Sequence, residues 1–178
     1  FLDMPKWYAC RRFEDDELAG ARCYAGLDLG QSDDLSAHVR IWMLDDGRVA
    51  VKGRFWIPRA ARLAHPDRPY EEWIRAGVLE ETDGDVVDYD VIERVVSADC
   101  RDSGVIECAY DKRFAGQMAL HLEDDGVTMI DTPQGFFLNE AVRRLAELVK
   151  TGQLAHNGNP VLAWMASNVV VKHGRNQE

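Results

Sequence analysis

The fold is decided by Tyr24-Ala25-Gly26-Leu27-Asp28-Leu29-Gly30. This run is short, apolar and bounded by turn residues, which is typical of a buried strand. A polar turn, Gln31-Ser32-Asp33-Asp34, leads from it into a second apolar run. Because a carboxylate inside a buried strand is unfavourable unless positive charge lies beside it, Asp28 needs a basic side chain or a bound cation as its partner.

A second segment repeats this pattern much later in the chain. It reads Val105-Ile106-Glu107-Cys108-Ala109-Tyr110-Asp111 and is again a strand-like run that closes on an aspartate. If the two strands are neighbours, Asp28 and Asp111 converge at one edge of the sheet. Two carboxylates in that position favour a hard divalent cation such as Mg²⁺.

Length and charge limit the class of function. A chain of 178 residues with 46% hydrophobic content predicts one domain with a substantial core. The net charge of -10 argues against a broad basic surface that binds nucleic acid, but it is compatible with a metal-dependent nuclease whose basic residues form a narrow strip. The arginines that could form such a strip, each of which could equally be solvated surface, are Arg11, Arg12, Arg59, Arg62, Arg113, Arg143 and Arg144.

The cysteines and the chain ends bear on location and domain organisation. The four cysteines lack a C-x-x-C spacing, which argues against a zinc site and favours reduced thiols in a cytoplasmic setting. No stretch is long enough for a membrane span, and no signal peptide is recognisable. Residues 1–21 are predicted to be a linker, with Trp7 and Tyr8 as candidate anchors, and both chain ends are interpreted as cuts from a longer protein.

The middle of the chain predicts an antiparallel meander of three strands. Residues 37–44 alternate in a period of two, with Ala37, Val39, Ile41 and Met43 on one face. Asp45-Asp46-Gly47 then predicts a hairpin, and residues 49–57 return as the third strand.

The second half of the chain predicts alternating helices and strands. Residues 58–69 are expected to be a loop, and Asp90 is expected to cap a helix whose buried stripe begins at Val91. The other expected elements are helices over 70–76, 114–122, 138–150 and 160–165 and strands over 105–111, 127–131 and from 169. This order predicts an α/β fold, a ribonuclease H-like mixed sheet of five or more strands flanked by helices. In that fold the first and fourth strands are parallel neighbours, which would set Asp28 beside Asp111.

The sequence also resembles a known family, the nuclease domain of the phage terminase large subunit, from Trp7 to Asn168. The resemblance rests on the order and spacing of short motifs. They are Ala25-Gly26-Leu27-Asp28-Leu29, Asp34-Leu35-Ser36-Ala37, Phe55-Trp56-Ile57-Pro58, Pro69-Tyr70-Glu71-Glu72-Trp73, Gly77-Val78-Leu79, Asp88-Tyr89-Asp90, Ala109-Tyr110-Asp111, Gln134-Gly135-Phe136, His156-Asn157-Gly158-Asn159-Pro160 and Ser167-Asn168-Val169-Val170.

The resemblance implies an endonuclease that cuts concatemeric double-stranded DNA by two-metal-ion hydrolysis with Mg²⁺ or Mn²⁺. In the family three acids hold the two metals, and the first two match Asp28 and Asp111. The third lies in a motif that this chain, ending at Glu178, does not reach. The family's ATPase motor is not represented either, since no G-x-x-x-x-G-K-[ST] motif occurs.

Each candidate site residue has an alternative interpretation. We expect Asp28 to bridge the metals and Asp111 to be the second ligand, although an aspartate at a strand end can also be purely structural. Asp34 is either a further ligand or an acid that closes the turn. Lys112 and Arg113 either contact DNA phosphates or are a solvated helix start, and Gln134 either orients DNA or water or belongs to a structural loop.

Two further functions remain open from the sequence. One is a non-catalytic module that docks on DNA or on the portal, and the other is a different ribonuclease H-like nuclease, such as a resolvase or transposase, against which the charge of -10 counts. The partners that the resemblance implies are double-stranded DNA, the ATPase domain of the same polypeptide, the small terminase subunit and the portal, with no membrane. The expected location is the host cytoplasm, at the procapsid.

Overall fold

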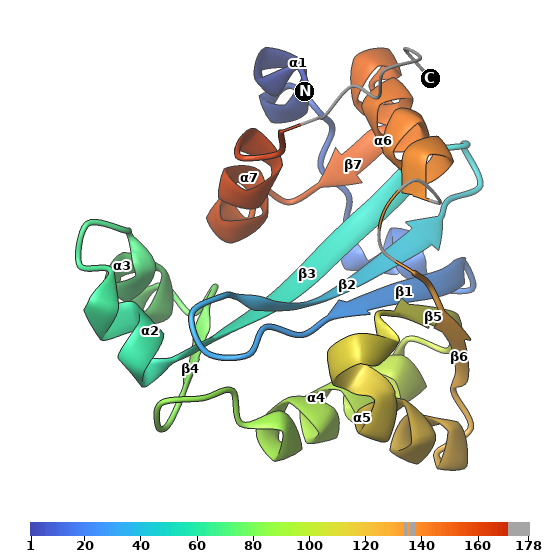
Figure 1. Cartoon of the computed structure of the whole chain (residues 1–178). Helices are drawn as coiled ribbons and strands as arrows, with labels where there is room; N and C mark the ends of the chain where they lie inside the picture. The colour runs from blue at the N-terminus through green and yellow to red at the C-terminus, as the bar shows by residue number, and fades with distance from the viewer. Residues whose placement is uncertain (134, 136–137, 171–178) are drawn as a thin grey trace.

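A mixed β-sheet forms the centre of the molecule (Figure 1). The computed structural model describes residues 1–133, 135 and 138–170. In this part of the chain the sheet has seven strands in the order β4-β3-β2-β1-β5-β6, and β7 also pairs with β3. The strands are β1 (Arg22–Asp28), β2 (Ser36–Met43), β3 (Val49–Pro58), β4 (Glu80–Thr82), β5 (Val105–Tyr110), β6 (Thr128–Asp131) and β7 (Leu154–His156).

The predicted meander is confirmed. β1 pairs with β2 and β2 with β3, both antiparallel, with Asp28 opposite Ala37 in the first pair. A tight turn joins β2 to β3, in which the Arg48 amide donates to Asp46 Oδ1 over 3.0 Å and Gly47 adopts a φ of 83°. Glycine reaches that left-handed conformation without the steric penalty that a side chain would add.

The parallel pairing of the first strand with the strand that ends before Asp111 is also confirmed. Ala25, Gly26 and Leu27 of β1 lie opposite Cys108, Ala109 and Tyr110 of β5. The register shifts once, because Cys23 pairs with Val105. β6 extends this parallel part of the sheet on the far side of β5.

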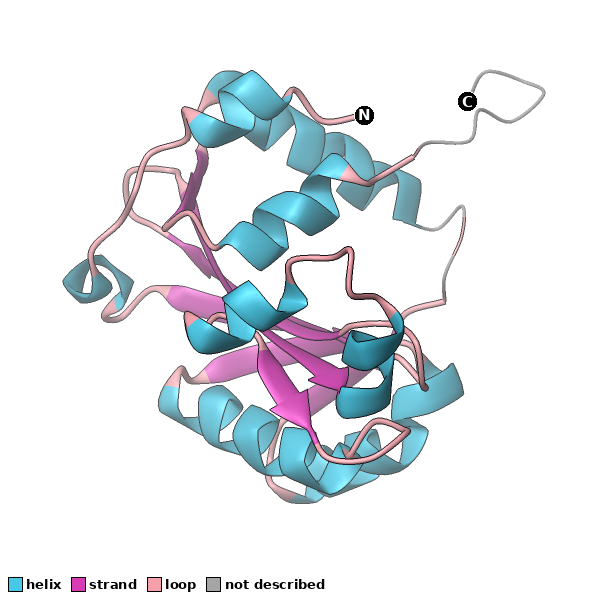
Figure 2. Cartoon of the chain, turned by 90° about the vertical axis from the view of Figure 1, so that its left-hand side faces the viewer, coloured by secondary structure: helices cyan, strands magenta, loops and turns pink. Residues whose placement is uncertain are grey.

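Helices cover both faces of the sheet (Figure 2). α4 (Tyr89–Asp102) and α5 (Lys112–Asp124) lie on one face, and α1 (Met4–Tyr8), α6 (Asn139–Thr151) and α7 (Pro160–Ser167) lie on the other. α2 (Arg59–Ala64) and α3 (Tyr70–Arg75) lie beyond the end of β3, and a short 3₁₀ helix η1 spans Asp15–Leu18. Of the helices in the described residues, none is long and apolar enough to cross a membrane.

The strand period divides the side chains between the two faces of the sheet. Leu27 and Cys108 point toward α4 and α5, where they are buried with Ile92, Val96 and Leu122. Strand neighbours point to opposite faces. Gly26, Asp28 and Ala109 therefore lie on the other face of the sheet, the one that α6 and α7 cover.

The segment 1–21, expected as a linker, packs against the domain through two aromatic side chains. Trp7 is buried and its ring stacks on His156 with a centroid distance of 4.6 Å. Phe13 is buried too, and its amide donates to Asn157 Oδ1 over 3.2 Å. Tyr8, the other candidate anchor, is exposed.

Several element predictions were wrong. Residues 58–69 are not all loop, because 59–64 form α2, a run of strong helix formers that ends before Pro66. Asp88, not Asp90, caps α4, and its side chain accepts from the Val91 amide over 3.1 Å. Residues 169 and 170 are not in a strand, and Val171 lies outside the described residues. The strands β4 and β7 were missed because three residues are too few to show a period.

Candidate functional site

The two aspartates singled out in the sequence lie next to each other at the end of the parallel strand pair. Leu27 lies opposite Tyr110, and Asp28 and Asp111 are the next residue in each chain segment. Both follow residues that point into the core, so both carboxylates emerge on the opposite face of the sheet. The prediction that these strands bring Asp28 beside Asp111 is therefore confirmed.

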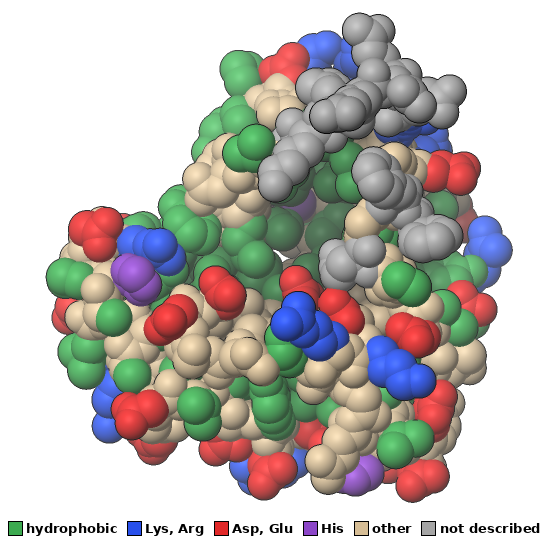
Figure 3. Space-filling model, in the orientation of Figure 1, with side chains coloured by type: hydrophobic (Ala, Val, Ile, Leu, Met, Phe, Trp, Pro, Cys, Tyr) green, Lys and Arg blue, Asp and Glu red, His purple; other side chains and the backbone are tan. Residues whose placement is uncertain are grey.

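A cavity of about 240 Å³ opens beside the two carboxylates. Small or apolar residues of three neighbouring strands form its floor, and Thr132 and Leu138 also line it. The floor residues are Gly26, Ala37, Val39 and Ala109. Figure 3 shows this face of the molecule, which is hollowed and lined with hydrophobic side chains, with acidic and basic side chains along its lower margin.

Negative charge accumulates at the site. Partial burial raises the pKa of Asp28, and the negative charges of Asp111 and Asp34 raise it further. Among the residues that the structure describes, no Lys, Arg or His nitrogen lies within ion-pair distance of Asp28, Asp34 or Asp111. Like charges in one place disfavour ionisation, and a cation bound between them would reverse this effect.

Asp111 has a structural task in addition to its place at the site. It is the N-cap of α5, and its Oδ1 accepts from the Arg113 amide over 2.9 Å. This bond fixes the orientation of the carboxylate and satisfies one of the free amides of the first helical turn. The second oxygen, Oδ2, makes no hydrogen bond within the described residues and is available to a ligand.

The loop between β1 and β2 brings Asp34 back toward Asp28. The Gly30 amide donates to Ser36 Oγ over 3.1 Å, and the Tyr89 hydroxyl donates to the Gly30 carbonyl over 3.0 Å. A Cβ on Gly30 would lie 2.6 Å from the carbonyl oxygen of Asp34, so the loop closes as tightly as it does only because residue 30 is glycine. The carboxylate of Asp34 takes part in no hydrogen bond within the described residues, and this gives no support to the alternative of a turn-closing acid.

Lys112 and Arg113 are exposed in the first turn of α5, directly after Asp111. The Arg113 guanidinium lies over the Phe114 ring at 5.1 Å from the centroid. Neither side chain is ion-paired within the described residues, so both charges face solvent beside the site. Gln134, the third candidate for DNA contact, lies outside the described residues.

Sequence reasoning missed a buried charged cluster on the opposite face of the sheet. Asp99 of α4 lies under β2 and β3, where Arg54 Nε donates to it over 2.7 Å and Arg40 Nη2 lies 3.1 Å away. His38 is fully buried and its Nδ1 lies 3.7 Å from Asp99 Oδ2. No local sequence motif indicates this cluster, because its members come from three separate elements.

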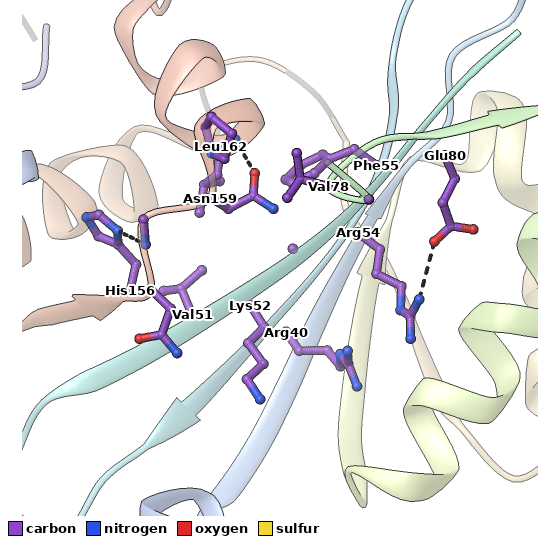
Figure 4. A pocket seen from close by; sticks show the side chains of 15 residues that line it. Arg40, Val51, Lys52, Arg54, Phe55, Val78, Glu80, His156, Asn159 and Leu162 are labelled. Atoms are coloured by element: carbon purple, nitrogen blue, oxygen red, sulfur yellow. Dashed lines mark hydrogen bonds and ion pairs between the residues drawn. The ribbon is translucent and has the colours of Figure 1, made fainter. Parts of the chain in front are cut away.

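A larger cavity of about 530 Å³ was missed as well (Figure 4). It opens at the outer edge of β3, between the residues that pair with β7 and those that pair with β4. Arg40, Lys52, Arg54 and Glu80 line it together with the 156–160 connection. None of Asp28, Asp34 and Asp111 borders this cavity, so it is separate from the acidic site.

The first strand pairs with an antiparallel strand on one side and with a parallel strand on the other. An aspartate lies at the end of each of the two parallel strands. This arrangement defines a ribonuclease H-like nuclease fold. The family described as terminase large subunit, endonuclease domain, matches residues 1–178, and the chain belongs to it. It is thus a terminase large-subunit nuclease domain.

Individual relatives agree with this membership. The chain is 32% identical over 177 residues to the terminase large subunit of Enterobacteria phage HK97, and 26% identical over 186 residues to protein YmfN of Escherichia coli (strain K12). These alignments cover 96% and 97% of this chain but only 35% and 41% of the two relatives.

Solved structures give the same result for the fold. The crystal structure of the HK97 large terminase matches with a TM-score of 0.83 at 29% identity, over 94% of this chain and 36% of that one. The nuclease domain of the SPP1 large terminase, crystallised with bound Mn, matches with a TM-score of 0.55 at 16% identity, over 93% of this chain and 79% of that one. At 16% identity this second match concerns the fold alone.

Proposed function

We propose that this chain is a divalent-metal-dependent endonuclease that hydrolyses phosphodiester bonds of double-stranded DNA. The observation that carries the proposal is the parallel register of β1 and β5, because it sets Asp28 and Asp111 side by side at the margin of an open cavity. Carboxylates that converge without a basic partner in the described part of the chain are the ligands that Mg²⁺ and Mn²⁺ prefer. Large terminase nucleases of phages SPP1 and G20c were crystallised with Mn and with magnesium, respectively.

In this proposal Asp28, Asp111 and Asp34 would hold the cations. Asp28 would be the most rigidly held of the three ligands, because it belongs to a strand paired on both sides. Asp34 approaches from the loop that Gly30 closes. Bound divalent cations would lower the pKa of an attacking water and stabilise charge on the leaving 3′ oxygen.

The other residues of the site act on the DNA. The Arg113 amide holds the Asp111 carboxylate in one orientation, while the side chains of Lys112 and Arg113 contact phosphates of the cleaved strand. The small side chains of Gly26, Ala37 and Ala109 leave room for a DNA strand to approach the acids. Gln134 orients DNA or water. No protein nucleophile takes part.

One observation favours a second candidate, a non-catalytic module that docks on DNA or on the portal. Across residues 1–133, 135 and 138–170 no group of three or more His, Cys, Asp or Glu side chains is arranged to hold a metal ion. The family resemblance implies a third acidic ligand in a motif outside residues 1–178, in addition to Asp28 and Asp111. The two candidates therefore differ in what an extended protein should do.

Family membership supports proposals about the whole protein. The substrate would be concatemeric DNA, and the place of action would be the procapsid in the host cytoplasm. Residues 1–21 would lead in from an ATPase domain of the same polypeptide, and residues 22–178 would form the nuclease domain. The small terminase subunit and the portal would be the protein partners.

The test is plasmid cleavage with Mn²⁺ or Mg²⁺ by this chain and by a version that extends beyond Glu178. We expect the extended protein to nick and linearise the plasmid and the Asp28→Asn and Asp111→Asn variants to be inactive. Asp131→Asn is the matched control, because Asp131 ends the neighbouring strand β6 opposite Tyr110, whose side chain packs toward the core with α5. Cleavage by Asp28→Asn at the parent rate would refute the catalytic role. DNA binding without cleavage by the extended protein would favour the docking module.

A further inference from the structure

The Arg68 side chain is held in a defined position between α3 and α7. Its Nη1 donates to the Tyr70 hydroxyl over 2.7 Å. Its guanidinium carbon lies 5.8 Å from the centroid of the Tyr70 ring and 5.9 Å from that of the Trp164 ring. Arginine is attracted to aromatic faces at such distances, so the two rings act as a platform for the cation.

The platform is rigid because it belongs to a core. Tyr70 is only 2% exposed, and its ring centroid lies 5.9 Å from that of Trp73 and 6.3 Å from that of Trp164. The same core contains Phe55 and Ile57 of β3. Arg68 therefore loses little further freedom when it binds a ligand, since its orientation is already fixed.

The positive charge of Arg68 is not taken up by an ion pair within the described residues. Within the described residues no carboxylate lies in ion-pair distance of its guanidinium, although Asp67 precedes it in the sequence. The arginines of the preceding helix differ, because Arg59 and Arg62 both pair with Glu81. A fixed and uncompensated guanidinium at a protein surface is suited to bind an anion, and its planar donors match a phosphate.

Arg68 lies on the side of the acidic site that faces β2 and β3. The core under Tyr70 includes Leu35 and Ala37, which directly follow Asp34 and lie opposite Asp28, respectively. The pKa of Arg68 is raised, first by the hydrogen bond to Tyr70 and to a smaller extent by the charges of Asp67 and Asp34, so Asp34 is within electrostatic reach. Lys112 and Arg113 are the first two residues of α5. This helix follows β5, which lies on the other side of β1 from β2 and β3 in the sheet order (Figure 1).

We propose that Arg68 binds a backbone phosphate of the DNA on the β2–β3 side of the acidic site, across from Lys112 and Arg113. The inference rests on the proposed nuclease function and adds a second, fixed contact that sets how the strand crosses the carboxylates. Arg68 acts as a positioning residue in this scheme: it binds the strand beside the reacting phosphate. Because phosphate contacts carry no sequence information, the contribution should be the same for any DNA sequence.

The test is DNA binding by Arg68→Gln and Arg68→Lys, measured by fluorescence anisotropy on a duplex over a range of salt concentrations, with Ca²⁺ in place of Mg²⁺. We expect Arg68→Gln to weaken binding roughly tenfold and to reduce the slope of log affinity against log salt by about one. Arg68→Lys should keep the slope but lose part of the affinity, because lysine has neither the planar donors nor the aromatic stacking. Arg75→Gln is the matched control, because Arg75 lies on the adjacent helix, has a 74% exposed side chain and pairs with Glu71.

The outcomes separate this inference from the function beneath it. If Asp28→Asn still cleaves, the nuclease proposal fails whatever the Arg68 variants do. The second case is an Asp28→Asn variant that is inactive but binds DNA. If both Arg68 variants then bind DNA with the affinity and salt slope of the parent, Arg68 makes no phosphate contact. In that case only the inference about Arg68 fails. Melting temperatures of the variants identify a change in folding, and Arg68→Lys keeps the test valid if Arg68→Gln unfolds.

Discussion

Asp28 and Asp111 each come directly after one member of the parallel pair Leu27–Tyr110, so two carboxylates leave the sheet side by side. The pairing of β1 with β5, two inner strands of the sheet, fixes this proximity. Asparagine in either position would remove the charge without changing the backbone pairing, so the site can be tested by mutation. The repulsion between the acids is part of the folded state until a cation relieves it.

A first prediction concerns this repulsion. We expect Mn²⁺ or Mg²⁺ to raise the melting temperature of the chain, because a ligand that binds only the folded state stabilises it, by about 2.7 kcal/mol at a hundredfold excess over Kd. In EDTA, Asp28→Asn should melt at or above the parent temperature, because it removes a charge that its surroundings disfavour. With metal, the same variant should show little or no shift in a thermal melt.

The control for the metal response is Asp131→Asn, which should respond to metal as the parent does. A parent protein whose melting temperature is insensitive to millimolar Mn²⁺, or an Asp28→Asn variant with the full metal response, would contradict the assignment of Asp28 as a ligand.

A second prediction separates the two tasks of Asp111. Asparagine is as good an N-cap as aspartate, so Asp111→Asn should keep the stability of the parent while it loses metal binding. Asp111→Ala should lose both, with a decrease in the free energy of unfolding of about 1 kcal/mol from the lost cap. Urea denaturation in EDTA measures the stability, and titration calorimetry with Mn²⁺ measures the binding. Equal stability of the two variants would mean that the bond from the Arg113 amide contributes nothing.

A third prediction concerns the loop that carries Asp34. In Gly30→Ala the new methyl group would meet the Asp34 carbonyl oxygen at 2.6 Å, and because that atom is backbone the loop itself has to move. We expect weaker binding of Mn²⁺ in titration calorimetry and slower DNA cleavage by the extended protein. Gly116→Ala is the matched control: the nearest atom to its methyl group would be 3.9 Å away, and alanine should stabilise α5 by up to about 1 kcal/mol. Metal affinity in Gly30→Ala equal to that of the parent would show that Asp34 is not needed.

The acidic site was predictable because its signals are local. A short apolar run that ends in an acid occurs twice, at Asp28 and at Asp111, and the order of strands and helices then makes the two runs neighbours. The loop that carries Asp34 was predictable for the same reason, because Gln31-Ser32-Asp33-Asp34 is a polar turn between two apolar runs. The aromatic platform of Arg68 was not, because Tyr70 and Trp164 are distant in sequence and become neighbours only when α7 packs over β3.

The short strands β4 and β7 and the Asp99 cluster were missed because their partners lie far away in the chain. β4 and β7 are each three residues long, and both are strands because they pair with the outer edge of β3. The Asp99 cluster gave no signal for a related reason. Arg40 and Arg54 alternate with apolar residues in their strands as surface side chains would, and only the packing of α4 under the sheet turns them into partners of Asp99.

A fourth prediction follows for this cluster. Asp99→Ala would leave Arg40 and Arg54 without their shared carboxylate under α4. Removal of one partner from a fully buried ion pair typically lowers the free energy of unfolding by about 3–5 kcal/mol, and the loss here should lie near or below the lower end of that range, because the Arg54 side chain is 42% exposed. Urea denaturation of Asp99→Ala measures the loss. The control is Asp102→Ala, near the end of the same helix, whose carboxylate takes part in no ion pair within the described residues. A loss below about 1 kcal/mol in Asp99→Ala would mean that water replaces the carboxylate at this position.

The last prediction concerns pH, because Asp99 and His38 both titrate inside this cluster. Burial lowers the pKa of His38, and the charges of Arg40 and Arg54 act in the same direction while Asp99 opposes them. Burial alone would raise the pKa of Asp99, but His38, Arg40 and Arg54 outweigh it and lower the pKa. Both groups therefore bind protons more weakly in the folded chain than in the unfolded one. Their stabilising contribution is complete above the unfolded pKa and is lost as the pH falls through the folded pKa.

The two groups lose their contribution in different ranges. For His38 the loss begins below about pH 6.5, and for Asp99 it begins below about pH 3.9. The midpoint of urea unfolding should therefore fall between pH 7.5 and pH 5, and His38→Gln should flatten this fall because glutamine has no proton to gain. His121→Gln is the control, because His121 is half-exposed and bonds Glu93 at the surface. If His38→Gln keeps the pH dependence of the parent, the fall belongs to other groups, and the buried imidazole takes no part in it.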